Sequence, residues 1–179
     1  MEEKPNMLIF DSAYSYDMII NRKMTGHLTS RNPRLYFNKV WDQAKECEPK
    51  SSGIGMIFMP RNIKNREIAK NICEQEAQYL GFTSRGWRDV PVNQDVLGRL
   101  AKDNAPFITQ WLVTFQDQKI NLEALLFRLK QRISNRANLE LSEDELGLYI
   151  CSLSSKTIVY KGMVRSEILG PFYNDLEDK

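Results

Sequence analysis

The amino-acid sequence predicts an α+β protein with a layered sheet-and-helix arrangement. Short runs rich in apolar, β-branched and aromatic residues alternate with longer segments whose apolar residues recur every three or four positions. Gly and Pro stand between these segments, where they are expected to end helices and strands. The order that results after residue 52, β-α-β-α-β-α-β-β, is typical of an α+β layered structure.

The length and composition of the chain are typical of a globular protein. The chain has 179 residues, of which 42% are hydrophobic and 27% charged, as in an average globular protein. This length is enough for one domain or two very small ones, with a core that needs neither disulfides nor a metal. Collagen, low-complexity disorder and a disulfide scaffold are excluded.

The first part of the chain is less regular than the rest. We expect a strand over residues 7–10, a helix over 13–24 and a turn-rich stretch over 25–36. The stretch 46–52 (Glu-Cys-Glu-Pro-Lys-Ser-Ser) has the composition of a linker. We therefore predict a boundary there, with an N-terminal segment 1–52 of uncertain origin, divergent or foreign, and a second unit 53–179.

The second unit shows clear periodicity. Apolar residues share one helix face over 62–80 and again over 121–136, and Gly81 stands where a C-terminal cap is expected. Pro60 and Pro91 are expected to end strands. In chain order the prediction is strand 53–59, helix 62–80, strand 86–90, helix 94–103, strand 107–115, helix 121–136, strands 148–153 and 157–160, and helix 164–176.

Charge and apolar runs exclude several classes of protein. The net charge is +2, well short of the basic bias of a nucleic-acid binder. Arg128, Lys130, Arg132 and Arg136 could form a basic helix face, but a solvated amphipathic helix is the favoured interpretation. The apolar run 53–59 is far shorter than the ~20 residues of a membrane span. The first residues lack the apolar core of a signal peptide, so a soluble, cytoplasmic protein is expected.

The residues that could carry chemistry form no recognised motif. Ser152, Ser154, Ser155 and Lys156 lack the S-x-x-K spacing, and a polar hairpin turn is favoured. Gly53-Ile-Gly55 lies inside a predicted strand and does not open a helix, so it is no phosphate cradle.

The cysteines and the histidine give no metal centre and no clear nucleophile. The three cysteines are Cys47, Cys73 and Cys151, without paired spacing, and His27 is the one histidine. We expect Cys73 and Cys151 in the core, and Cys47 exposed between acidic neighbours that oppose thiolate formation. His27 is expected at the surface. From the residues alone we assign no catalytic, cofactor-binding or metal-binding residue.

Residues 53–179 resemble the middle of a known enzyme domain. The matching strings are Gly55–Pro60, Gly86–Val92, Val96–Gly98, Asn104–Pro106 with Gln110, Phe127–Ile133, Leu148–Met163 and Val164–Leu176. They are similar to the glutaminase domain of glutamate synthase, a type 2 glutamine amidotransferase, and most of all to its ferredoxin-dependent form. The resemblance implies a partial Ntn-hydrolase-like (αββα) domain, whose full family hydrolyses glutamine to glutamate and ammonia.

The resemblance also implies what these residues lack. The family uses an N-terminal cysteine whose α-amine is the base, and an Asn-Gly segment that stabilises the oxyanion. This chain begins Met-Glu-Glu and contains no Asn-Gly, and Cys47 is followed by Glu. We therefore expect the chain to be inactive alone. FMN and an iron–sulfur cluster are implied only for other domains of the family enzyme, with none in this chain.

Two alternatives remain open. A non-catalytic scaffold or interaction module would keep the family's middle layers without its chemistry. Residues 8–41 weakly resemble the start of a nucleotide-sugar glycosyltransferase, which leaves a glycosyltransferase fragment as the third hypothesis. The expected partners are the remaining glutamate synthase domains, or a second copy of the chain through open sheet edges. A plastid enzyme would place the chain in the stroma instead of the cytoplasm.

Overall fold

The computed structural model describes residues 47, 49–117, 119–141, 147–162, 164 and 166–176. Among these residues, four strands form one antiparallel sheet in the order β2-β3-β1-β4. The strands are β1 (Ser52–Met59), β2 (Thr83–Asp89), β3 (Phe107–Thr114) and β4 (Tyr149–Ser154). β1 and β3 lie in the centre, and nearly all of their residues are buried. Helices and antiparallel strands together make this an α+β structure, as predicted.

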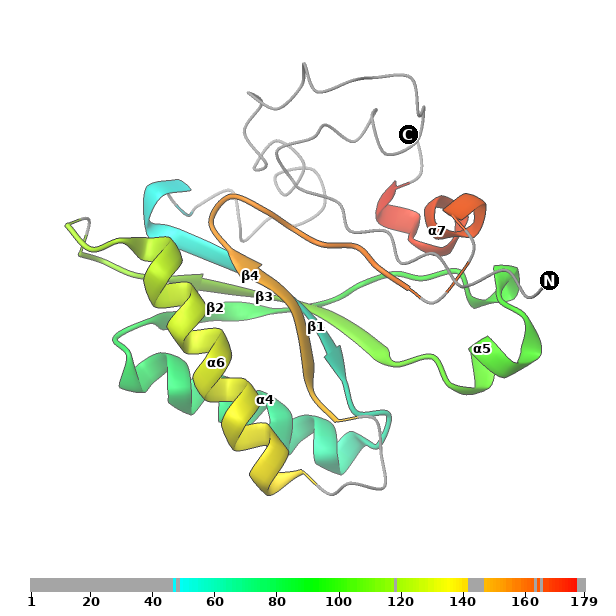
Figure 1. Cartoon of the computed structure of the whole chain (residues 1–179), viewed down its shortest axis with the longest axis horizontal. Helices are drawn as coiled ribbons and strands as arrows, with labels where there is room; N and C mark the ends of the chain where they lie inside the picture. Colours follow the sequence, from blue (N-terminus) through cyan, green and yellow to red (C-terminus); the bar gives the residue numbers. More distant parts are fainter. Residues whose placement is uncertain are drawn as a thin grey trace, which may run out of the picture.

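Two long helices cover one face of the sheet. These are α4 (Ile63–Tyr79) and α6 (Leu122–Glu140), which lie side by side below the strands in Figure 1. Ile72 and Cys73 from α4 and Leu129 and Ile133 from α6 are almost fully buried. They pack with Trp111 of β3 in a first apolar cluster between helices and sheet. The three- and four-residue spacing of these apolar positions is the cause of this packing.

The helix ends follow from local chemistry. Asn62 caps α4, because its Oδ1 accepts hydrogen bonds from the backbone of Lys64 at 2.8 Å and Asn65 at 3.4 Å. At the other end Gly81 has φ +83°, a conformation that L side chains rarely adopt. Phe82 N donates to the carbonyl of Ala77 at 2.9 Å, which completes a Schellman-type cap. The predicted role of Gly81 is confirmed.

The opposite face of the sheet is covered by the end of the chain. We call residues 157–162 and 166–176, which include α7 (Ser166–Phe172) and η3 (Asn174–Leu176), the C-terminal strap. Its apolar side chains form a second cluster with residues from the sheet. From the strap these are Ile158, Tyr160, Leu169, Phe172, Tyr173 and Leu176, and from the sheet Ile54, Met56, Ile108 and Leu112. Figure 1 shows α7 on the far side of the sheet from α4 and α6.

One predicted strand is wrong. Residues 157–160 form no strand, and they leave β4 after the turn at Ser155 and Lys156. Their apolar residues are buried against the sheet face in the second cluster, as Ile158 and Tyr160 show. The alternation that resembles a strand therefore reflects contact with a sheet face and not pairing with a sheet edge.

Other predicted elements have limits that differ from the prediction. The helix expected over 94–103 is split into η2 (Gln94–Val96) and α5 (Arg99–Asp103), with Gly98 as the N-cap of α5. The helix expected over 164–176 is split into α7 and η3, since Tyr173 forms a β-bridge with Val92. The strand expected over 86–90 is β2, which begins earlier, at Thr83. Its first residues are polar and lie in an edge strand, so no apolar pattern predicts them.

Candidate functional site

The cysteines of the described chain are poor nucleophiles. Cys73 is fully buried, and its burial, with Glu74 beside it, raises the pKa of its thiol far above the usual range. Cys151 is half-buried, and burial raises the pKa of its thiol to about 12, against the opposing effect of Lys161 and Lys130. Both thiols therefore stay protonated near neutral pH, where a thiolate would be needed. Cys47 was expected to be exposed, but it is half-buried against the second apolar cluster.

The serines near the end of β4 are held by a carboxylate. Glu123, in the first turn of α6, accepts hydrogen bonds from Ser154 Oγ at 2.8 Å and from Ser155 N at 2.6 Å and Oγ at 2.5 Å. Ser154 Oγ also accepts from the backbone nitrogens of Lys156 and Thr157. These contacts shape the turn that follows β4. The interpretation as a polar turn, in place of a serine–lysine site, fits this geometry.

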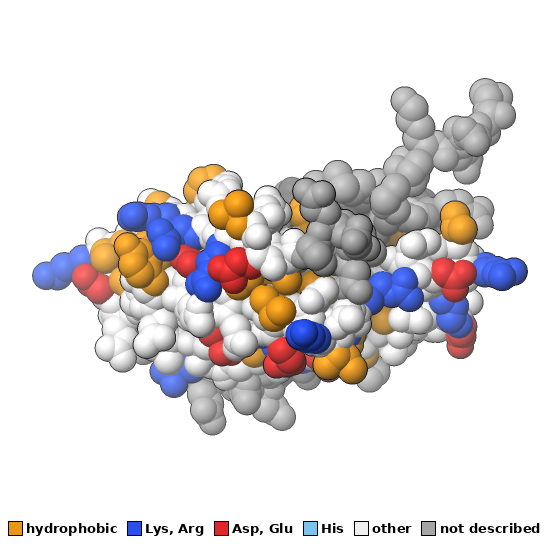
Figure 2. Space-filling view, turned by 90° about the horizontal axis from the view of Figure 1, so that it is seen from below, with side chains coloured by type: hydrophobic (Ala, Val, Ile, Leu, Met, Phe, Trp, Pro, Cys, Tyr) orange, Lys and Arg blue, Asp and Glu red, His pale blue; other side chains and the backbone are white. Residues whose placement is uncertain are grey.

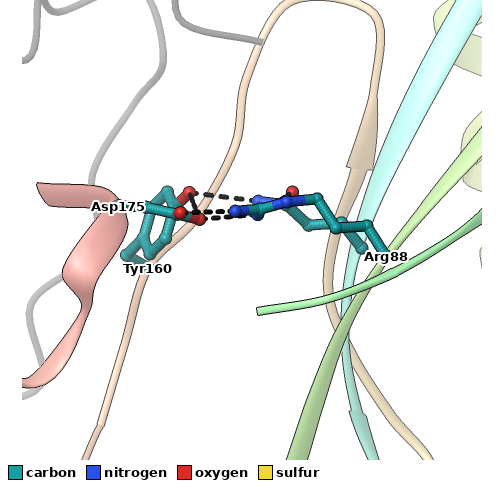
Figure 3. A network of polar contacts seen from close by, with 4 residues as sticks. Arg88, Tyr160 and Asp175 are labelled. Carbon is teal, nitrogen blue, oxygen red and sulfur yellow. Dashed lines mark hydrogen bonds and ion pairs between the residues drawn. The ribbon is translucent and has the colours of Figure 1, made fainter. Parts of the chain in front are cut away.

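A group of four polar side chains lies between the sheet and the strap. Arg88 of β2 donates from its two terminal nitrogens to the two carboxylate oxygens of Asp175 in η3, at 2.7 and 2.6 Å. Gln110 of β3 accepts from Arg88 at 2.9 Å and donates to Tyr160 Oη at 3.0 Å. The hydroxyl of Tyr160 donates to Asp175 at 3.2 Å. Figure 3 shows Tyr160 and Asp175 turned toward Arg88.

This network is suited to fixing the position of the strap on the sheet. The side chain of Asp175 is only 3% exposed and that of Arg88 16%, so both charges are largely withdrawn from water. A bidentate arginine–carboxylate pair has strong geometric preferences and fixes the relative position of its two elements. The bonds of Arg88 and Asp175 to each other and to Gln110 and Tyr160 therefore position the strap relative to the sheet.

No role was assigned to these four residues from the sequence. Arg88, Gln110, Tyr160 and Asp175 all fall inside strings that resemble the glutaminase domain, but their partnership joins positions up to 87 residues apart. Gln110 carried the one local signal, since it stands alone as a polar amide among the apolar and β-branched residues of 107–115. A buried polar side chain in a strand requires a hydrogen-bonding partner.

A second charged group joins the two long helices. Glu76 of α4, only 7% exposed, accepts hydrogen bonds from Arg132 at 2.5 Å and Arg136 at 3.3 Å, both in α6. Arg136 also contacts Glu140 at 2.6 Å. Lys130 of the same helix donates to the carbonyl of Cys151 at 3.5 Å, so three of the four basic residues of the predicted helix face have contacts within the protein. In Figure 2, basic and acidic side chains are interspersed over the face shown.

The remaining candidates give no site in the described chain. Gly53 and Gly55 lie within β1, as expected, and Gly53 packs closely against Leu126 of α6. Within the described ranges, no three His, Cys, Asp or Glu side chains gather in a way that could hold a metal ion. No helix there is long and apolar enough to cross a membrane. His27 and the segment 8–41 lie outside the described residues.

Comparison with known proteins identifies the family. The model of the class-II glutamine amidotransferases matches residues 25–179. The chain belongs to this family. It is 44% identical over 128 residues to ferredoxin-dependent glutamate synthase 2 of Synechocystis sp., a match that covers 70% of the chain. It is 38% identical over 157 residues, 85% of the chain, to ferredoxin-dependent glutamate synthase 1 of Arabidopsis thaliana.

The relatives are much longer than this chain. The matched region covers 8% of the Synechocystis protein and 10% of the Arabidopsis protein. The large chain of the NADPH glutamate synthase of Azospirillum brasilense is also similar, with 36% identity over 131 residues. The resemblance to the glutaminase domain of glutamate synthase is therefore confirmed. The family match begins at residue 25, and the boundary expected near residue 52 stays a prediction.

Proposed function

We propose that this chain forms part of a glutaminase domain of the glutamate synthase type, in which the side-chain amide of glutamine is hydrolysed to glutamate and ammonia. The observation that carries the proposal is the family match over residues 25–179, with glutamate synthases as relatives. The antiparallel sheet with α4 and α6 on one face supports its interpretation as one half of an αββα, Ntn-hydrolase-like sandwich.

The second part of the proposal is that the 179 residues are inactive by themselves. Nucleophile, base and oxyanion donors must meet within about 3 Å of the reacting carbon. The N-terminal cysteine and the Asn-Gly segment on which the family depends are not among these residues. Burial keeps Cys73 and Cys151 protonated, and Glu123 engages the hydroxyls of Ser154 and Ser155. The chain would then contribute the scaffold of the domain and not its catalytic groups.

A chimera tests the first part. Residues 53–176 would replace the stretch that they match in a ferredoxin-dependent glutamate synthase, and glutamine hydrolysis would be measured. We expect the chimera to keep glutaminase activity, because the scaffold is equivalent. The ammonia-dependent reaction of the FMN-containing domain serves as the control for folding. A chimera that uses ammonia normally but does not hydrolyse glutamine would contradict the proposal.

Intact-mass spectrometry tests the second part. The 179-residue chain would be incubated with a glutamine-analogue diazoketone, which alkylates the nucleophilic cysteine of amidotransferases, and a full-length family enzyme would be the positive control. We expect no stoichiometric adduct on the folded chain. A glutamine-protectable adduct on Cys47, Cys73 or Cys151, abolished by substitution of that cysteine with Ala, would show a working nucleophile and overturn this part.

The non-catalytic interaction module is the second candidate function. It is favoured by the open outer edges of the sheet, since no strand in the described part of the chain pairs with the free side of β2 or of β4. Calorimetry of glutamine binding to the chimera separates the two candidates. A non-catalytic interaction module would not support glutamine binding even after it is grafted into the synthase.

The partners and location follow from the same proposal. The remaining domains of a glutamate synthase would complete the fold and would carry the FMN and the iron–sulfur cluster. The relatives named as chloroplastic support a plastid stroma as one location, with the cytoplasm as the other. Sedimentation of the chain together with the remaining domains, expressed separately, would show whether they associate.

A further inference from the structure

Within the described residues, the hydrogen bonds between the strap and the sheet each involve at least one side chain. At its start, the strap backbone donates from Thr157 N to Ser154 Oγ at 3.1 Å and from Val159 N to Ser152 Oγ at 3.0 Å, both in β4. Near its end, the strap bonds to the loop after β2, where Asn93 N donates to Phe172 O at 2.8 Å and Asn174 N donates to Pro91 O at 3.2 Å. Its backbone forms no ladder with a sheet strand in the described residues. Apolar contact is strong but has no preferred direction, so it cannot alone fix where the strap lies.

The Arg88 network supplies the charged contact that joins the end of the strap to the sheet, in addition to the bonds that join its start to β4. Asp175 and Tyr160 stand 15 residues apart in the chain, and each bonds to the sheet through this network. Arg88 and Gln110 supply the sheet side from neighbouring strands, and they form a cross-strand pair in the register of β2 and β3. Four side chains thus join two points of the strap to two strands.

The contacts on the helix face are separate from this network. Glu76, Arg132 and Arg136 join α4 to α6, and the first apolar cluster shares no buried residue with the second. The sheet lies between the two clusters. Loss of contacts on the strap face can therefore occur while the helix face stays packed.

We propose that the Arg88–Gln110–Tyr160–Asp175 network is a latch, and that the strap opens and closes over the sheet as one cooperative unit controlled by it. Opening exposes the apolar sheet face formed by Ile54, Met56, Ile108 and Leu112, without unfolding of α4 or α6. Local opening of this kind, below the free energy of global unfolding, is a general property of proteins. The inference rests on the geometry of the strap and is independent of the proposed glutaminase function.

Hydrogen exchange with mass spectrometry of the full chain tests the latch. Asp175→Asn removes the charge of a buried carboxylate while keeping its shape, and Glu76→Gln is the matched change on the helix face. We expect Asp175→Asn to speed exchange in the strap by about 10- to 100-fold, as the loss of charge-assisted hydrogen bonds predicts. Exchange in α4 and α6 should stay unchanged in this variant, whereas Glu76→Gln should affect α4 and α6 and leave the strap unchanged.

A dye that binds apolar surfaces provides a second measurement. Anilinonaphthalene sulfonate fluorescence should rise with Asp175→Asn and not with Glu76→Gln, because only the first change uncovers the sheet face. If Asp175→Asn does not fold, Tyr160→Phe removes only the hydroxyl bonds and should speed strap exchange about 3- to 10-fold.

Three results would overturn the proposal. Exchange that rises equally in the strap, α4 and α6 would mean that the network belongs to a single unfolding unit. Unchanged strap exchange in both Asp175→Asn and Tyr160→Phe would mean that the network does not hold the strap. Hydrogen exchange in the strap that is as fast after Glu76→Gln as after Asp175→Asn would mean that the two faces of the sheet do not open independently.

Discussion

At Gly53 the sheet and α6 lie close together. A Cβ added there would lie 2.7 Å from both terminal carbons of Leu126, a side chain that is itself fully buried. We expect Gly53→Ala to destabilise the protein by about 1–3 kcal/mol, as overpacking of a dense core usually does. Urea unfolding measures the change. Gly98→Ala is the control, since a Cβ at Gly98 meets nothing within 4 Å, and equal losses for both variants would contradict the steric argument.

Cys151 should show an unusual pH profile of alkylation. Burial raises the pKa of its thiol from 9.0 to about 12, so the thiolate of the folded protein forms only as the pH approaches 12. We expect its iodoacetamide rate to keep rising through pH 9–11, where the rate of an unperturbed thiol levels off. Peptide mapping measures the rate, with the urea-unfolded chain as control. A plateau near pH 9 in the folded protein would contradict the burial argument.

The same pKa shift affects stability with a defined sign. Above pH 9 the thiol ionises in the unfolded chain and not in the folded one, so the unfolded state binds fewer protons. The contribution of Cys151 to stability is therefore fully present below pH 9 and is lost as the pH rises from 9 to about 12.

At the scale of an element, Glu123 joins the start of α6 to the end of β4. It accepts three hydrogen bonds, and two of the donors are in Ser155. We expect Glu123→Ala to destabilise the protein by about 2–3 kcal/mol, because it leaves partly buried donors without their charged acceptor. Thermal unfolding measures the loss.

Glu140→Ala is the matched control for this prediction. Glu140 forms an exposed pair with Arg136 one turn away, a contact of the kind that contributes about 0.3–0.5 kcal/mol. A loss for Glu123→Ala no larger than that for Glu140→Ala would show that the carboxylate does not fix the turn after β4.

The elements that sequence patterns predicted well are those with one buried face. The predicted helix 62–80 is α4, Ile63–Tyr79, and the predicted strand 107–115 is β3, Phe107–Thr114. The predicted helix 121–136 is four residues shorter at its end than α6, which ends at Glu140. Ala137 continues the buried face four residues after Ile133, but a single alanine is a weak apolar signal and the exposed Leu139 lies off that face. The apolar spacing alone therefore does not mark where the helix ends.

The strap network could not be predicted for a related reason. Tyr160 and Asp175 meet Arg88 and Gln110 only through tertiary packing, and no spacing along the chain brings them together. The family resemblance was different, because it depends on strings such as Gly86–Val92 that can be matched without knowledge of contacts. The family could thus be predicted while this four-residue polar network could not.

At the scale of the whole molecule, the two edges of the sheet differ in their chemistry. β2 carries the exposed charged residues Arg85 and Asp89, and a register shift beside Gly86 distorts its pairing with β3. β4, with the sequence Tyr-Ile-Cys-Ser-Leu-Ser, has no charged residue, although its pairing with β1 also contains a register shift. The difference between the edges is therefore their charge, and charged residues are one of the usual means by which proteins prevent strands from pairing between molecules. β4 is therefore the edge at which we expect strand addition by a second copy of the chain.

A charge placed on β4 tests this expectation. Tyr149 is 49% exposed, and Lys161 lies over its ring with the ammonium 3.9 Å from the ring centre. Tyr149→Glu would place a carboxylate beside that ammonium, so we expect the folded chain to tolerate the substitution. The same carboxylate would give the β4 edge a charge, which should oppose pairing of β4 with a strand of a second copy. We expect sedimentation velocity to show less self-association for Tyr149→Glu than for the unaltered chain at the same concentration. Thr83→Glu, which adds the same charge to the already charged β2 edge, should leave association unchanged, and an equal effect of both variants would mean that net charge and not the β4 edge governs association.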